Sequence, residues 1–237
     1  MSDTSPADTT VTDTRGVPLC ELRDIKVAFG GLHAVDGVTV DLYPGEVIGL
    51  VGGNGAGKCT LIHTLSGAHP ADAGEIRING QTVVIHNPRD ARNYGVEVIY
   101  QKLALADNID AAANVFLGRE LRTKTGSLDD EAMDSATQKV MQRLNPRFKN
   151  LKTAVKSLSG GHRQSVAIAR AVHFNARILI MDEPCAALGP AETRMVLETI
   201  KRLKAEGIGI FLISHEMHDV FEVCDRATVM KNGSVVG

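Results

Sequence analysis

Short apolar runs alternate along this chain with longer segments whose apolar residues recur at helical spacing. Near the start, the runs at residues 19–29, 34–42 and 47–51 contain many β-branched residues, and glycine- or proline-containing turns separate them. Runs of this length and composition predict three strands. The third run is almost entirely apolar, which is typical of a strand buried on both faces of a sheet.

The segment that follows predicts a helix, a hairpin and a further strand. Residues 60–65 can form the helix, with Gly67 near its C-cap. Residues 74–86 predict a hairpin because Asn79-Gly80 separates their two halves. Residues 96–100 predict a strand that leads directly into Gln101.

Helical spacing dominates from about residue 102 to residue 173. One helix is indicated by apolar residues that share a face, at positions 133, 136, 140, 141 and 144. The Asn-Pro pair at 145–146 ends this helix, and a second helix is expected over residues 165–172. We interpret the region as a helical insertion between two parts of an α/β core.

The last third of the chain returns to alternating strands and helices. Strands are expected at residues 177–181 and 208–213, helices at 191–205 and up to residue 223, and a final hairpin around 231–233. This alternation predicts a mostly parallel sheet whose ligands bind at the carboxyl ends of the strands.

Composition narrows the class of protein. The chain has 237 residues and a net charge of −2, so a general affinity for nucleic acid is not expected. Its four cysteines at 20, 59, 185 and 224 form no CxxC pair, which argues against a disulfide framework or a zinc site. Residues 1–18 are rich in Ser and Thr and have no apolar core, so we expect a disordered tail and no signal peptide. No apolar run approaches the roughly 20 residues that span a bilayer, and an extension beyond Gly237 is left open.

A glycine-rich segment joins the third strand to the first helix. Its residues are Gly52, Gly53, Asn54, Gly55, Ala56, Gly57 and Lys58, followed by Cys59 and Thr60. Glycines let backbone N–H groups converge on an anion, and the lysine can reach the β- and γ-phosphates of a nucleotide. The segment therefore predicts a phosphate-binding loop, or P-loop. The pattern requires Ser or Thr after the lysine, and this chain has Cys59 there.

Five motifs in order make residues 19–237 resemble the nucleotide-binding subunits of ABC transporters. The P-loop is similar to their Walker A loop, Gln101 to their Q-loop, and LSGGH at 158–162 to their signature. ILIMDEP at 178–184 is similar to the Walker B motif, and His215 to the switch histidine.

The resemblance implies an α/β fold with three parts. Residues 19–101 and 174–237 would form a P-loop NTPase core with a RecA-like, mostly parallel sheet and an N-terminal antiparallel β subdomain. Residues from about 102 to 173 would form a helical subdomain that carries the signature.

The resemblance also implies how each motif acts on ATP and Mg²⁺. Asp182 would hold the metal, Glu183 would act as general base, and Gln101 would sense Mg²⁺ and the γ-phosphate. His215 would contact the γ-phosphate, and Phe29 would stack on adenine. The signature residues would complete the nucleotide site of a second, identical subunit in a head-to-tail dimer; these residues are Ser159, Gly160 and Gly161.

Some of these residues also have plainer interpretations. Gln101 alone would be a surface residue, Ser159 a helix N-cap, and Phe29 a core aromatic at a strand end. The HEMH segment at 215–218 does not match the HExxH zinc motif, because its histidines are three residues apart and not four.

Two sequence segments resemble those of proteins that import sugars. NPRDARNYGVEVIYQ at 87–101 and ALADNIDAAANVFLGREL at 104–121 resemble ATPases of bacterial monosaccharide importers, such as those for fructose or ribose. The implied partners are transmembrane permease subunits and, indirectly, a periplasmic sugar-binding protein. The implied location is the cytoplasmic face of the bacterial inner membrane.

Departures from the motifs leave a second hypothesis. A thiol at Cys59 is a poor ligand for Mg²⁺, and losing about 2–4 kcal/mol of transition-state stabilisation would slow hydrolysis about 30- to 1000-fold. Cys185 replaces a usual Thr, Gly189 a usual Asp, and His162 a usual Gln. The alternative is therefore an ATP-binding regulatory or structural module with little hydrolysis. A DNA-repair or translation ATPase would need coiled-coil, zinc-bearing or tandem-cassette features, which this sequence lacks.

Overall fold

Two sheets make up the strand portion of the computed structural model, which describes residues 16–149 and 151–237. The first sheet is antiparallel, with the order β2-β1-β4-β5. Its strands are β1 (Cys20–Phe29), β2 (Leu32–Leu42), β4 (Ala73–Ile78) and β5 (Gln81–Val83). Asn79 and Gly80 turn the β4–β5 hairpin with φ values of 50° and 76°, as the Asn-Gly pair predicts. Of the predicted tail at 1–18, only residues 16–18 are described, and they form neither helix nor strand.

The second sheet has six strands in the order β10-β9-β3-β8-β7-β6. They are β3 (Val47–Val51), β6 (Val96–Ile99), β7 (Ile178–Asp182), β8 (Gly209–Ile213), β9 (Arg226–Lys231) and β10 (Ser234–Val235). All neighbours from β9 to β6 run parallel, and only β10 is antiparallel to β9. The prediction of a mostly parallel sheet is therefore confirmed.

Four of the seven α-helices in the described residues begin at a residue whose side chain accepts hydrogen bonds from free N–H groups of the first turn. The seven helices are α1 (Lys58–Leu65), α2 (Pro88–Asn93), α3 (Ala111–Phe116), α4 (Asp130–Leu144), α5 (Gly160–His173), α6 (Pro190–Ala205) and α7 (Met217–Val223), with a 3-10 turn at Val155–Ser157. Asn87, Asp110, Asp129 and Ser159 cap four of them. The cap at Ser159 starts α5 at Gly160, so the predicted start at residue 165 is wrong. The short helices α2 and α3 were not predicted.

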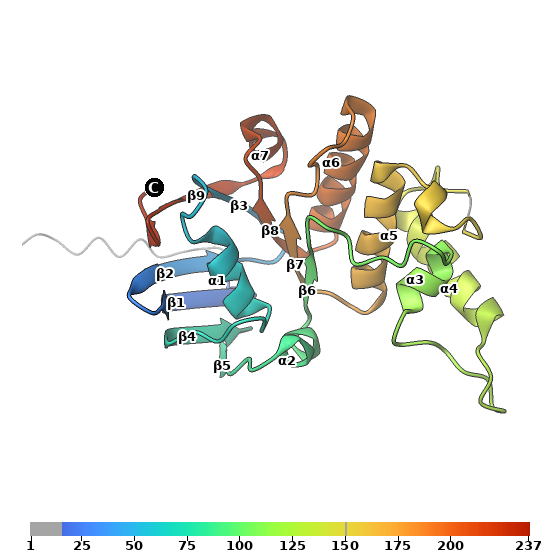
Figure 1. The fold of residues 1–237 in the computed structure, drawn as a ribbon, viewed down its shortest axis with the longest axis horizontal. Coiled ribbons are helices and arrows are strands. Elements are labelled where there is room, and N and C mark those ends of the chain that lie inside the picture. The colour runs from blue at the N-terminus through green and yellow to red at the C-terminus, as the bar shows by residue number, and fades with distance from the viewer. Residues whose placement is uncertain (1–15, 150) are drawn as a thin grey trace, which may run out of the picture.

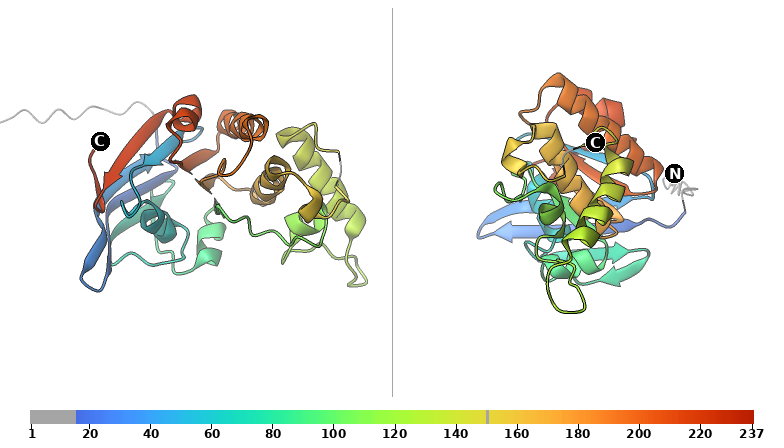
Figure 2. Two further views of the ribbon diagram at one scale, coloured as in Figure 1. Left: turned by 45° about the horizontal axis from the view of Figure 1, so that its top comes forward. Right: turned by 90° about the vertical axis from the view of Figure 1, so that its right-hand side faces the viewer.

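The six-stranded sheet separates two hydrophobic cores. Alternate residues of a strand point to opposite faces, so Leu50 and Phe211 face α1 and the antiparallel sheet. Val47 and Leu212 face the other core, which includes residues of α3, α4, α5 and α6. Figures 1 and 2 show the antiparallel sheet and helices α3–α5 at opposite ends of the molecule, with the parallel sheet between them. This burial on both faces explains why β3 and β8 are apolar.

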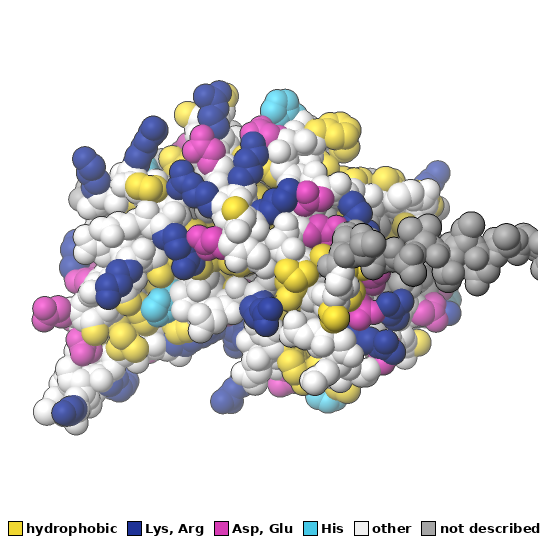
Figure 3. Space-filling view, turned by 180° about the vertical axis from the view of Figure 1, so that it is seen from behind, with side chains coloured by type: hydrophobic (Ala, Val, Ile, Leu, Met, Phe, Trp, Pro, Cys, Tyr) yellow, Lys and Arg dark blue, Asp and Glu magenta, His cyan; other side chains and the backbone are white. Residues whose placement is uncertain are grey.

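The surface carries charges of both signs. On the face shown in Figure 3, Lys and Arg side chains are interspersed with Asp and Glu and do not gather into one basic patch. Within residues 16–149 and 151–237, none of the helices has the length and apolar character needed to cross a bilayer.

Candidate functional site

The candidate site lies where three neighbouring parallel strands end. Leu50 of β3 and Asp182 of β7 both pair with Ile213 of β8, so the three strands end at the same level. The P-loop continues from β3, Glu183 follows β7, and His215 comes shortly after β8. Sheet register therefore gathers three of the motifs at one edge, as the sequence predicts.

The P-loop follows a path that its glycines make possible. Gly52 and Gly57 have φ values of +147° and +99°, which side chains rarely adopt. A Cβ at Gly52 would lie 2.2 Å from the carbonyl oxygen of Met230, and one at Gly57 would lie 2.3 Å from that of Ala34. At Gly52 and Gly57 the loop consequently packs against the backbone of β9 and β2 with no space for a side chain.

Lys58 lies across the loop that precedes it. Its Nζ donates hydrogen bonds to the carbonyl oxygens of Gly52, at 2.8 Å, and Gly53, at 3.0 Å. The ammonium group is thus held beside the glycine-rich turn at the N-terminus of α1, where backbone N–H groups and the helix dipole favour an anion.

Asp182 ends β7 next to this loop. Partial burial and the charge of Glu183 raise the pKa of Asp182, whereas the nearby charges of His63 and Lys58 lower it. A carboxylate at the carboxyl end of a strand and beside a phosphate loop is suited to a hard divalent cation. His63 was not predicted as a site residue; its only signal in the sequence was its position four residues after Cys59, on the same face of α1.

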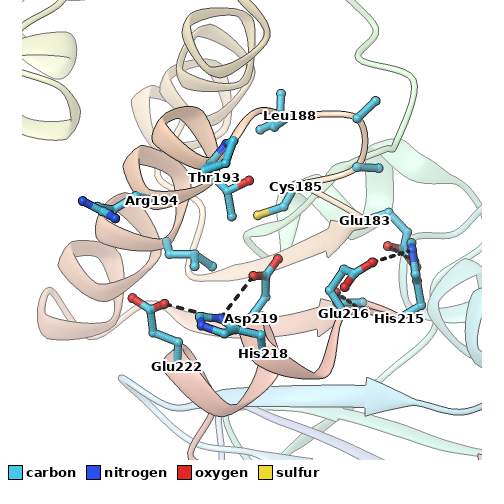
Figure 4. A pocket seen from close by; sticks show the side chains of 15 residues that line it. Glu183, Cys185, Leu188, Thr193, Arg194, His215, Glu216, His218, Asp219 and Glu222 are labelled. Carbon is cyan, nitrogen blue, oxygen red and sulfur yellow. Dashed lines mark hydrogen bonds and ion pairs between the residues drawn. The ribbon is translucent and has the colours of Figure 1, made fainter.

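Glu183 and His215 form a direct pair. Glu183 Oε2 lies 2.7 Å from His215 Nδ1, and this contact is the largest cause of the raised pKa of His215. Glu183 also has a φ of 51°, a strained backbone conformation of the kind found at functional sites. Figure 4 shows the two side chains pointing toward each other from different loops. The pair brings together the predicted base and switch histidine.

A cavity of about 530 Å³ opens beside this pair. The segment after β7 lines it on one side and helices α6 and α7 on the others. Cys185 and Asp219 point into it (Figure 4), and burial is the main reason that the pKa of the Cys185 thiol rises to about 12. The raised pKa keeps this cysteine a neutral thiol at physiological pH.

Gln101 reaches the same region from β6. It is exposed, as its plainer interpretation expects. It also lines a cavity of about 370 Å³ together with Glu183 and Gly160. The structure therefore places the predicted Q-loop residue between the Walker B segment and the signature helix.

The signature residues form the N-terminus of α5. The Ser159 hydroxyl accepts a hydrogen bond from His162 N–H at 3.4 Å, so the N-cap interpretation is confirmed. The Gly161 N–H donates to Glu192 Oε1 of α6 at 3.4 Å. Hydrogen bonds from Ser159 and from the N–H groups of Gly189 and Gly161 lower the pKa of Glu192. Sequence reasoning missed Glu192, whose signal was only its place in the first turn of a helix.

Phe29 ends β1 at the tip of the β1–β2 hairpin. Half of its surface is exposed, so the interpretation as a core aromatic is wrong. Its ring centroid lies 4.8 Å from that of His69. An exposed aromatic ring leaves one face free for a planar group, as base stacking requires.

Two of the three candidate metal ligands suit Mg²⁺, and the third does not. Asp182 and Gln101 offer oxygen, which Mg²⁺ prefers, whereas Cys59 offers sulfur. Partial desolvation and the charge of Asp182 raise the pKa of the Cys59 thiol, although its side chain is exposed. Among the described residues, no three His, Cys, Asp or Glu side chains are arranged to bind a metal by themselves. A metal at this edge therefore requires ligands from a bound nucleotide.

The sequence of this chain is similar to a known protein family and to several known proteins. A family model described as "ABC transporter" matches residues 35–186. The chain is 42% identical to the xylose/arabinose import ATP-binding protein of Sulfolobus acidocaldarius, over 92% of this chain and 86% of that protein. It is 46% identical to ribose import ATP-binding proteins of Escherichia coli O157:H7 and Burkholderia cenocepacia, over 93% of this chain. The chain spans only 43% of the length of those two relatives.

Solved structures of similar proteins have the same fold. One is a nucleotide-free ATP-binding cassette from an ABC transporter, with a TM-score of 0.81 and 25% identity, over 93% of this chain and 90% of that one. Another is the ADP conformation of such a cassette, with a TM-score of 0.82, 27% identity and the same coverage. The predicted fold class, with its antiparallel sheet, mostly parallel sheet and helices, is therefore confirmed.

Proposed function

Because this chain belongs to the ABC transporter family of ATP-binding proteins, we propose that it binds and hydrolyses ATP to drive import of a monosaccharide into a bacterial cell. The observation that carries the proposal is the convergence of P-loop, Asp182, Glu183 and His215 at one edge of the sheet. Ribose and xylose/arabinose appear in the names of the relatives, which supports a monosaccharide as the cargo.

Each residue has a proposed role in ATP turnover. Lys58 and the P-loop N–H groups bind the β- and γ-phosphates, and the exposed ring of Phe29 stacks on adenine. Asp182 and Gln101 hold Mg²⁺, which neutralises phosphate charge. Glu183 accepts a proton from the attacking water, and His215 orients Glu183 and contacts the γ-phosphate.

The proposed assembly has two cassettes. The signature residues of one chain complete the ATP site of a second, identical chain, with Ser159 and the α5 N-terminus directed at the γ-phosphate. Closure around ATP and reopening after hydrolysis would move permease subunits at the cytoplasmic face of the inner membrane. A periplasmic sugar-binding protein would deliver the cargo to those permeases.

The first test is ATP binding and steady-state hydrolysis by the purified chain with Mg²⁺. We expect binding that Lys58→Ala weakens at least about tenfold and turnover that Glu183→Gln lowers about 10²- to 10⁴-fold. In the source organism, deletion of the gene should abolish ATP-dependent uptake of one labelled sugar among ribose, xylose, arabinose and fructose. Absence of ATP binding in the wild-type chain would overturn the proposal.

A second candidate function is ATP binding with little hydrolysis, for regulation or assembly. Two residues favour it: Cys59 at the hydroxyl position of the P-loop and Gly189 at a usual Asp position. Turnover of the wild-type chain compared with Cys59→Ser distinguishes the two functions. Tight ATP binding, with turnover that appears only in the serine variant, would support the second candidate.

A further inference from the structure

Cys59 is the point at which this nucleotide site departs furthest from what Mg²⁺ requires. It is the second residue of α1 and is exposed. Its thiol occupies the position at which the P-loop pattern has a metal-binding hydroxyl. Sulfur is a soft donor that binds Mg²⁺ poorly and transition metals well. Relative to the P-loop pattern, one candidate ligand is therefore sulfur in place of oxygen, whereas Asp182 and Gln101 offer oxygen.

Sheet register brings Cys59 and Asp182 to one place. Leu50 and Asp182 both pair with Ile213, so β3 and β7 end level and about 10 Å apart, two strand spacings. The P-loop returns the chain to this edge, where α1 begins. After desolvation, the charge of Asp182 is the next cause of the raised pKa of the Cys59 thiol, which agrees with the proximity that the register gives.

We propose that the nucleotide site of this chain binds a first-row transition ion, from Mn²⁺ to Zn²⁺, in preference to Mg²⁺, with Cys59 Sγ as a direct ligand. The inference rests on the proposed ATP binding, because phosphate oxygens must complete the ligand set. Asp182 supplies a carboxylate as the second protein ligand, and the described residues offer no set of three such side chains. The thiol gives up its proton to solvent when the metal binds.

Calorimetric binding of a non-hydrolysable ATP analogue tests the proposal. The analogue is titrated with Mg²⁺ and with Mn²⁺ into wild-type protein and into Cys59→Ser, which restores the hydroxyl. The ratio of the Mg²⁺ to the Mn²⁺ dissociation constant should be about tenfold larger in the wild type. Equal ratios in the two proteins would overturn the inference.

Cadmium provides a readout that does not depend on affinity. With Cd²⁺ and the analogue, wild-type protein should show an ultraviolet sulfur-to-cadmium charge-transfer band that Cys59→Ser lacks. Cys185→Ser is the matched control and should keep the band, because the Cys185 thiol hydrogen-bonds to Asp219 in a separate cavity. A band of equal strength in Cys59→Ser would overturn the inference.

The two proposals fail in distinguishable ways. If neither protein binds the analogue with any metal, the proposed function fails, and the metal inference fails with it. If both bind it with equal metal ratios, ATP binding stands and only the role of Cys59 is lost. Circular dichroism of both proteins shows that the comparison is made between folded chains.

Discussion

Glu183 Oε2 and His215 Nδ1 lie 2.7 Å apart, across the carboxyl ends of two hydrogen-bonded strands. Because β7 and β8 are neighbours in the sheet, their register sets the approximate position of one side chain relative to the other. His215, on the segment that follows the adjacent strand β8, thus orients the Glu183 carboxylate, which is the proposed base. The pairing also couples the charge of His215 to Glu183.

The pKa of His215 should depend on Glu183. Its pKa is raised, first by the hydrogen bond to Glu183 and then by the charge of Glu183, with a smaller contribution from Glu216. In Glu183→Gln, the His215 resonance should titrate near the ordinary histidine value of about 6.5. NMR titration of the ring protons measures this, and Glu216→Gln should cause a smaller decrease. An unchanged titration in Glu183→Gln would contradict the pair.

The same pair predicts how stability varies with pH. Since the folded-state pKa of His215 is raised, the stabilisation by the pair is fully present below about pH 6.5, the ordinary histidine value. This stabilisation is lost as the pH rises through the raised folded-state pKa of His215. Urea unfolding of wild type and Glu183→Gln across this window should show their difference in stability shrinking toward higher pH. A difference that does not vary with pH would argue against a charged pair.

Replacement of Glu183 should separate ATP binding from hydrolysis. Gln has the same shape but cannot accept a proton, so turnover should fall about 10²- to 10⁴-fold. Affinity for ATP should stay within a few-fold, because the P-loop and Lys58 bind the phosphates. Phosphate release and nucleotide titration measure the two quantities. Glu216→Gln is the control. It makes the same chemical change at an exposed carboxylate near His215 and should retain turnover.

Two adjacent P-loop glycines should differ in tolerance to a methyl group. Gly52→Ala places a Cβ 2.2 Å from the Met230 carbonyl oxygen at a φ of +147°, so we expect a loss of at least about 2 kcal/mol. Gly53→Ala meets no atom within 4 Å and should change stability by less than about 0.5 kcal/mol. Urea denaturation midpoints test both. Similar midpoints for the two variants would mean that the loop moves to accept a side chain at Gly52.

Features with a strong local signal were predicted from the sequence. Residues 47–51 form β3 as expected, because a short apolar run bounded by turns reports burial on both faces. The turn at Asn79-Gly80 was equally clear, since both residues readily adopt positive φ. In contrast, α2 and α3 have six residues each, too few to show a helical period, and only Asn87 and Asp110 marked their starts.

The site was predictable where a motif is continuous along the chain. The P-loop and the Asp182-Glu183 pair each occupy one segment at a strand end, so sequence order alone places them. The contact of Glu192 with the Gly161 N–H joins two helices, and the influence of His63 on Asp182 joins a helix to a distant strand. Hydrophobic periodicity carries no information on such polar contacts, because it depends on burial and not on which polar groups meet.

Restoring the hydroxyl at position 59 should increase hydrolysis with Mg²⁺. Cys59→Ser exchanges a soft ligand for a hard one, and recovery of about 2–4 kcal/mol in the transition state corresponds to about a 30- to 1000-fold higher turnover. Cys185→Ser, in a thiol outside the P-loop, should leave turnover unchanged. Equal turnover in wild type and Cys59→Ser would mean that the residue does not limit hydrolysis.

Gly189 provides a test that separates stability from communication between subunits. It is the N-cap of α6, with a φ of −75°, and its backbone N–H donates to Glu192 Oε2 at 3.2 Å. A Cβ there would meet no atom within 4 Å. Both Gly189→Asp and Gly189→Asn can therefore add a side-chain cap, worth a few tenths of a kcal/mol to about 1 kcal/mol.

The two substitutions should differ in ATP turnover. Asp is the residue usual at this position in ABC subunits, so Gly189→Asp should raise both turnover and its cooperativity in ATP if the loop contacts a second chain. Gly189→Asn adds a similar cap without the charge and should raise stability alone. Thermal unfolding and ATP-dependent rates measure the two effects on the same proteins. Equal rates in Asp and Asn variants would show that Gly189 affects helix stability and not the contact between cassettes, because only the charge distinguishes them.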